Sequence, residues 1–102
     1  MIHLSRLSAA VLAGAAALAH AQDANLGRNL AATCANCHGT NGYARGDSMP
    51  LAGVSAEKIV AAFADFKSGA MPATIMHQIA KGYTDDQVKA IAAFFAAQPA
   101  KP

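Results

Sequence analysis

One short motif, Cys34-Ala35-Asn36-Cys37-His38, limits the folds open to this chain. Two residues separate its cysteines, and a histidine directly follows the second cysteine. Residues three positions apart are neighbours on a helix surface, so one turn places both thiols over one edge of a bound molecule. The c-x-x-c-h pattern is typical of covalent haem attachment, in which the thiols add to the two vinyl groups and the histidine reaches the iron. The sequence therefore predicts one haem c bound through Cys34 and Cys37, with His38 as an iron ligand.

Three other uses of a cysteine pair compete with this interpretation. A redox-active C-x-x-C disulfide belongs to a thioredoxin-like βαβ context, and the chain shows no strand pattern. A zinc site needs two further ligands, whereas His77 is the only other histidine after residue 21. A plain structural disulfide does not require His38. Haem attachment accounts for all three residues of the motif.

The first 21 residues have the pattern of a secretory signal peptide. Arg6 supplies the positive start, residues 9–19 form an apolar run, and Ala19-His20-Ala21 offers a small-x-small cleavage site. A membrane anchor is the alternative, but a bilayer needs about 20 consecutive apolar residues, roughly twice the length of this run. We therefore expect cleavage after Ala21 and a periplasmic protein with no membrane span.

The remaining chain is short enough to be one small domain. Removing 21 residues from 102 leaves 81, near the size at which a single apolar core supplies little net stability, so a bound cofactor would supplement it. The formal net charge of +2 falls to +1 without Arg6, and two haem propionates would make the loaded protein mildly acidic. We expect one monohaem domain over residues 22–102 and no nucleic-acid partner.

Apolar spacing predicts an all-α domain, because no segment alternates apolar and polar residues over enough length for a strand. Helices are expected over about 23–34, 56–68, 74–81 and 85–97, with a loop over 39–53. Ser55 is a good N-cap, and Thr84 with Gln87 has the pattern of a capping box. Gly69 and Gly82 are expected to end the second and third helices. The apolar positions at helical spacing are Ile59, Val60, Phe63, Phe66, Val88, Ile91, Ala92 and Phe95.

The second axial ligand of the iron has several candidates, namely Met49, Met71, Met76 and His77. Methionine is more often core filler than a ligand, so no single one is decisive alone. A ligand on the opposite ring face should come from the chain that crosses over after the middle helix. This favours Met71, Met76 or His77, and we interpret Met49 as a packing residue.

Five sequence blocks, taken in order, resemble the small class I bacterial cytochromes c over essentially the whole chain after the signal. The blocks are Gly27, Cys34 to Gly39, Pro50 to Gly53, Phe66 to Gly69, and Met76 to Phe95. The resemblance implies a class I cytochrome c fold, with three main helices and short helical segments around one covalently bound haem.

The same resemblance implies roles for particular residues. The family's methionine ligand stands three residues before an isoleucine-alanine pair, here Ile79-Ala80, which assigns the second ligand to Met76. Pro50 would offer its carbonyl to the ring N–H of His38. The first and last helices would cross at Gly27, with Leu30, Ile91 and Phe95 packed around the contact. His77 is then expected to be a polar surface residue.

Within the family, residues 71–83 look most like the one-haem cytochrome subunit of flavocytochrome c sulfide dehydrogenases. In such complexes a flavoprotein oxidises sulfide and passes electrons to the cytochrome. This implies an electron carrier rather than an enzyme, with an exported flavoprotein or another redox protein as partner.

Three alternatives for the function stay open at this point. One is a free soluble shuttle that delivers electrons to a terminal oxidase or another redox enzyme. A second is a gas- or ligand-binding haem protein with an open sixth site, and a third is bis-histidine ligation through His77. Ligation by both His38 and Met76 favours the carrier, because it leaves no coordination position open to a substrate.

Overall fold

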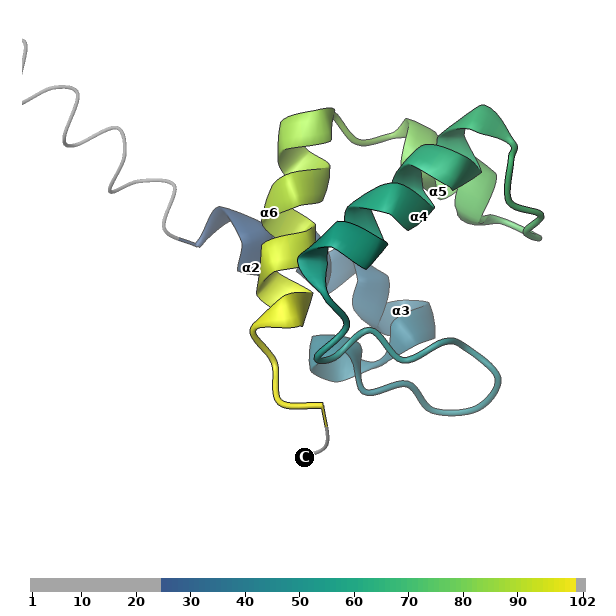
Figure 1. Ribbon diagram of the computed structural model, residues 1–102. Coiled ribbons are helices and arrows are strands. Elements are labelled where there is room, and N and C mark those ends of the chain that lie inside the picture. Colours follow the sequence, from purple (N-terminus) through teal and green to yellow (C-terminus); the bar gives the residue numbers. More distant parts are fainter. Residues whose placement is uncertain (1–24, 101–102) are drawn as a thin grey trace, which may run out of the picture.

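The structure, a computed structural model, describes residues 25–100, and within them every regular element is helical. The predicted signal peptide over residues 1–21 lies outside this part of the chain. The elements in order are α2 (Leu26–Ala31), η1 (Ala32–Cys34), α3 (Ala35–His38), η2 (Thr40–Gly42), α4 (Ala56–Ser68), α5 (Met76–Lys81) and α6 (Asp85–Ala96), where η denotes a 3₁₀ helix. Helix α6 packs against both α2 and α4, and α4 also contacts α5 (Figure 1). The prediction of an all-α domain is confirmed.

The first helical run extends past the predicted end at Cys34 and is less regular than the sequence predicts, and residues 23 and 24 of the prediction lie outside the described part of the chain. It begins as α2 at Leu26, tightens into η1, and continues as α3 through His38. The Thr33 hydroxyl donates a hydrogen bond to the Leu30 carbonyl oxygen at 3.0 Å. Hydrogen bonds of this type compete with the backbone ladder and often bend helices, which accounts for the tightened turn directly before the cysteine motif.

Helices α4 and α6 begin as their capping residues predict. The Ser55 hydroxyl accepts the backbone N–H of Lys58 at 3.3 Å, and Gly69 ends α4 in the left-handed conformation at φ +83°. At α6, the Gln87 N–H donates to the Thr84 hydroxyl at 3.2 Å while the Thr84 N–H donates to the Gln87 side chain at 2.9 Å. The predicted capping box is therefore confirmed.

The core forms where α2 and α4 pack on α6. A Cβ atom built at Gly27 would overlap with the carbonyl oxygen of Ala90 on α6, so the missing side chain is what allows α2 to approach. Ile91 and Phe95 are fully buried and Leu30 packs against them, as expected for this crossing. The buried residues of the core cluster are Ala31, Ile59, Phe63, Ala80, Val88, Ile91, Ala92 and Phe95.

The long segment between α3 and α4 is a loop with one 3₁₀ turn, η2, that the sequence did not predict. Asn41 within this turn has a positive φ of 56°. The backbone N–H of Leu51 donates to the Gly42 carbonyl at 2.9 Å, and the N–H of Gly53 donates to the Phe95 carbonyl on α6, also at 2.9 Å. The loop is therefore held against the same helix that carries the core.

Candidate haem-binding site

Cys34 is the N-cap of α3 and Cys37 is the third residue of that helix, and both are free thiols. Cys34 is half-buried and Cys37 is exposed. Burial raises the pKa of the Cys34 thiol above its ordinary value, and the neighbouring Thr33 hydroxyl offsets this only in part. Two unpaired thiols three residues apart are the arrangement that covalent attachment to one haem requires.

His38 is the last residue of α3, and its ring is held by the backbone of the following loop. Its Nδ1 lies 2.6 Å from the carbonyl oxygen of Met49. Because a carbonyl only accepts hydrogen bonds, the neutral imidazole carries its proton on Nδ1 in this contact. The Nε2 lone pair is then directed away from the loop and available to a metal.

The contact corrects the sequence prediction that Pro50 supplies this carbonyl. The accepting oxygen belongs to Met49, one residue earlier. Proline restricts the residue before it to extended conformations, which fixes the direction of that residue's carbonyl. The role of Pro50 is thus to orient Met49.

The interpretation of Met49 as a packing residue is also wrong. Its side chain is 69% exposed, so its contribution to the site is the backbone carbonyl. Sequence reasoning missed this role. The available signal was the Met49-Pro50 pair, because proline restricts the conformation of the residue before it.

The other three ligand candidates lie on or near α5. Met76 is its first residue and is half-buried, and Met71 is half-buried in the segment that precedes the helix. His77 is half-buried rather than a fully exposed polar residue, because its ring lies edge-on to Phe66 with centroids 6.5 Å apart. Ile75, next to Met76, is 57% exposed. The start of α5 therefore has an exposed apolar residue, Ile75, followed by the half-buried Met76.

The residues present fit a c-type haem. Two free thiols, an imidazole held through Nδ1 and a half-buried thioether are the donor set that such a group uses. In residues 25–100, no group of three or more His, Cys, Asp or Glu side chains is arranged to hold a metal ion.

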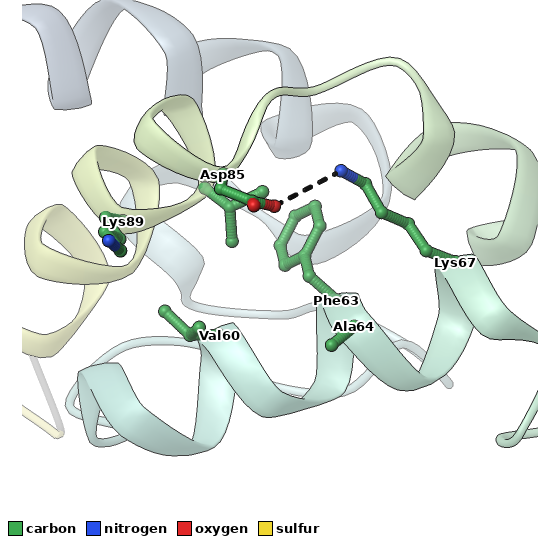
Figure 2. A pocket seen from close by; sticks show the side chains of 7 residues that line it. Val60, Phe63, Ala64, Lys67, Asp85 and Lys89 are labelled. Carbon is green, nitrogen blue, oxygen red and sulfur yellow. Dashed lines mark ion pairs between the residues drawn. The ribbon is translucent and has the colours of Figure 1, made fainter.

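A shallow cavity of about 290 Å³ lies elsewhere, between α4 and α6 (Figure 2). It is lined by Val60, Phe63, Ala64, Lys67, Asp85, Val88 and Lys89. An ion pair with an N–O distance of 3.8 Å joins Lys67 to Asp85 at this cavity. None of the four predicted haem-binding residues lines it, so it is distinct from the candidate haem site.

Comparison with known proteins finds no family model that matches, but several individual relatives. Cytochrome c-554(548) of Halomonas halodenitrificans is 34% identical over 82 residues, which are 76% of this chain and 99% of that protein. The chain belongs to the class I c-type cytochromes. It is therefore an electron carrier with one covalently bound haem c, and its helices form the class I cytochrome c fold.

The names of two further relatives connect them with dehydrogenases of sulfide and of thiosulfate. The cytochrome subunit of sulfide dehydrogenase from Chlorobaculum tepidum is 41% identical over 69 residues, 68% of this cytochrome. A thiosulfate dehydrogenase electron acceptor from Thiomonas intermedia is 38% identical over 73 residues, again 68% of this chain. The chain spans 63% of the first relative and 34% of the second.

None of the helices between residues 25 and 100 is long and apolar enough to cross a bilayer.

Proposed function

We propose that this cytochrome is periplasmic and accepts electrons as the one-haem subunit of a flavocytochrome c sulfide dehydrogenase. The 41% identity to the cytochrome subunit from Chlorobaculum tepidum supports this partner. The main structural support for the haem site is the hydrogen bond between His38 Nδ1 and the Met49 carbonyl. This bond holds the ring in an orientation in which Nε2 can bind iron.

In the proposed site, Cys34 and Cys37 would hold the haem covalently, and His38 and Met76 would be the two residues that bind its iron. The haem supplies a one-electron iron couple when bound. The chain's own residues hold and enclose it. The Met49 carbonyl would fix the orientation of the His38 ring and raise its donor strength, and Met76 would supply the second protein ligand, which would leave no position for water or substrate.

A second candidate partner is a thiosulfate-oxidising enzyme. The 38% identity to the electron acceptor from Thiomonas intermedia favours it. The site would be the same in both cases, since a cytochrome with two protein ligands receives electrons and does not itself act on the sulfur compound. The two proposals differ only in the protein that docks.

The axial ligand assignment is tested by the visible absorption of the ferric protein. A methionine–iron charge-transfer band should be present in the wild type and absent in Met76→Ala. Met71→Ala is the matched control, because Met71 is also half-buried and precedes α5, and it should retain the band. A band that survives Met76→Ala, or disappears in Met71→Ala, would remove Met76 from the site.

The partner is tested in periplasmic extract from the native source. The tagged holoprotein is incubated with the extract, and haem reduction is followed after addition of sulfide or of thiosulfate. Rapid reduction by sulfide together with co-purification of a flavoprotein supports the first proposal. Reduction by thiosulfate alone supports the second, and co-purification of neither enzyme would favour a free shuttle.

Export is tested by the mass of the secreted protein. Cleavage after Ala21 leaves Gln22 as the first residue, and the intact mass of the periplasmic holoprotein should match residues 22–102 with one haem. A holoprotein that accumulates in the cytoplasm with residues 1–21 intact would contradict periplasmic location.

A further inference from the structure

Tyr83, between α5 and α6, joins the two segments that carry the proposed haem ligands. Its hydroxyl oxygen lies 2.8 Å from the hydroxyl oxygen of Thr33, fifty residues earlier in the chain. Thr33 directly precedes Cys34 in η1. A single side-chain hydrogen bond thus spans from the end of the methionine-bearing helix to the cysteine motif.

The direction of this hydrogen bond follows from the other contact of Thr33. A threonine hydroxyl has one proton, and that of Thr33 is donated to the Leu30 carbonyl. Tyr83 must therefore donate to Thr33, so the hydrogen bonds run from the tyrosine hydroxyl through threonine to the backbone of α2. Such a chain of hydrogen bonds fixes the tyrosine more firmly than one isolated contact.

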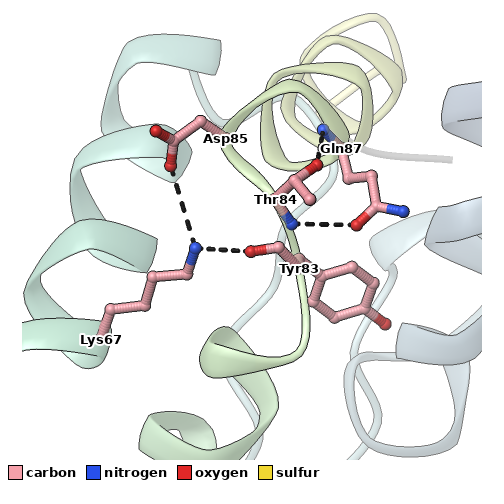
Figure 3. A network of polar contacts seen from close by, with 5 residues as sticks. All are labelled: Lys67, Tyr83, Thr84, Asp85 and Gln87. Atoms are coloured by element: carbon pink, nitrogen blue, oxygen red, sulfur yellow. Dashed lines mark hydrogen bonds and ion pairs between the residues drawn. The ribbon is translucent and has the colours of Figure 1, made fainter.

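The rest of Tyr83 is held by α4. Its backbone carbonyl accepts a hydrogen bond from Lys67 Nζ at 2.5 Å, and its ring lies edge-on to Phe63 with centroids 6.1 Å apart. In Figure 3 the ring points away from Lys67, toward the segment that carries the cysteines. The nearby ion pair adds little, because Asp85 is 94% exposed.

Helix α5 depends on such anchors. It has only six residues, too few for a helix to be stable alone in water. Met76 is at its first position, and Ala80, fully buried, and Tyr83 fix its other end. A displacement at the end near Tyr83 would therefore be transmitted along this short helix to the methionine.

The geometry points to Tyr83 as a positioning residue whose hydroxyl sets where the sulfur of Met76 lies relative to the cysteine motif. This inference rests on the proposed ligation by Met76. The hydroxyl does not touch the iron in this role; it limits how far α5 can move away from η1. Its removal should weaken the hold of Met76 on the metal without abolishing it.

The test is the affinity of the ferric holoprotein for added imidazole, which competes with Met76 for the metal. Tyr83→Phe removes one hydrogen bond, so imidazole should bind roughly three- to tenfold more tightly than to the wild type. The methionine–iron charge-transfer band should persist without imidazole. Tyr43→Phe is the matched control, because it makes the same change and removes a hydrogen bond of 2.6 Å to the Pro99 carbonyl at the other end of the fold. Its imidazole affinity should equal that of the wild type.

A second set of variants tests the bond itself. Thr33→Val should raise imidazole affinity by a similar factor, Thr33→Ser should restore the wild-type value, and Thr33→Val combined with Tyr83→Phe should add nothing further. Three outcomes would overturn the positioning role. Imidazole could bind the wild type and Tyr83→Phe equally well, its affinity could rise equally in Tyr43→Phe, or the effects could be additive in the double variant. A wild-type protein without the methionine–iron band would instead overturn the proposed ligation, so the two failures are distinguishable.

Discussion

Replacing Gly27 by alanine tests whether the contact between α2 and α6 holds the fold together. The added Cβ would overlap with the Ala90 carbonyl oxygen and lie 3.1 Å from the Ala90 carbonyl carbon and 3.4 Å from the Cβ of Phe94. Overpacking against backbone costs about 1–3 kcal/mol, whereas alanine gains up to about 1 kcal/mol over glycine in a helix. Because the clash is with backbone, the cost should lie at the upper end, about 2–3 kcal/mol, and the net loss after the gain of about 1 kcal/mol should be about 1–2 kcal/mol, which lowers the Tm of a domain of this size by about 5–15 °C.

The measurement is thermal unfolding of the oxidised holoprotein, followed by far-ultraviolet circular dichroism. Gly82→Ala is the matched control. Gly82 has a negative φ of −79°, and its Cβ would lie no closer than 3.3 Å to the Ile79 carbonyl oxygen, so we expect a change within about 0.5 kcal/mol. An unchanged or raised Tm in Gly27→Ala, with Gly82→Ala neutral, would refute the reasoning from close approach.

Pro50→Ala should free the preceding carbonyl from the His38 ring and weaken the imidazole as a donor, which destabilises the ferric state. A redox titration should show a rise on the order of tens of mV, since about 1 kcal/mol corresponds to about 43 mV for one electron, and a lowered potential would contradict this. His77→Ala should leave the low-spin ferric spectrum intact, and its loss would make His77 a ligand. Cys34→Ser combined with Cys37→Ser should abolish cooperative folding, because the small core loses the haem, its main apolar filler. A helical circular dichroism spectrum that melts cooperatively in this double variant would contradict the prediction.

The sequence predicted those parts of the fold that depend on neighbouring residues. Ser55, Thr84 and Gln87 satisfy backbone groups within three residues, so their effect does not require knowledge of the tertiary structure. Gly27 was predictable for a related reason, because a glycine inside a helical pattern is costly unless another element needs the space. Local chemistry thus located the main helices, whereas the family resemblance identified the last helix as the one that crosses the first at Gly27.

The remaining features depend on contacts that leave no periodic pattern in the sequence. The acceptor for His38 is a backbone carbonyl, and which residue supplies it depends on the path of a loop. The hydrogen bond between Thr33 and Tyr83 joins two side chains fifty residues apart, and neither residue type signals the other. The tightened turn at η1 arises from a threonine back-bond that the apolar spacing of the first helix does not indicate.

The contacts that hold the two proposed axial ligands differ in sequence separation. This difference bears on the alternative of a haem protein with an open sixth site. His38 is oriented by a carbonyl only eleven residues away, whereas α5 with Met76 is anchored through Tyr83 to a residue fifty positions earlier. Helix α5 has only six residues, of which one, Ala80, is buried, so it should open at lower free energy than the whole molecule. Mild denaturant should therefore abolish the methionine–iron band before helical circular dichroism falls, while His38 stays bound. The open sixth site is then a higher-energy state of an electron carrier rather than a different function, and its population is set by the contacts that hold α5.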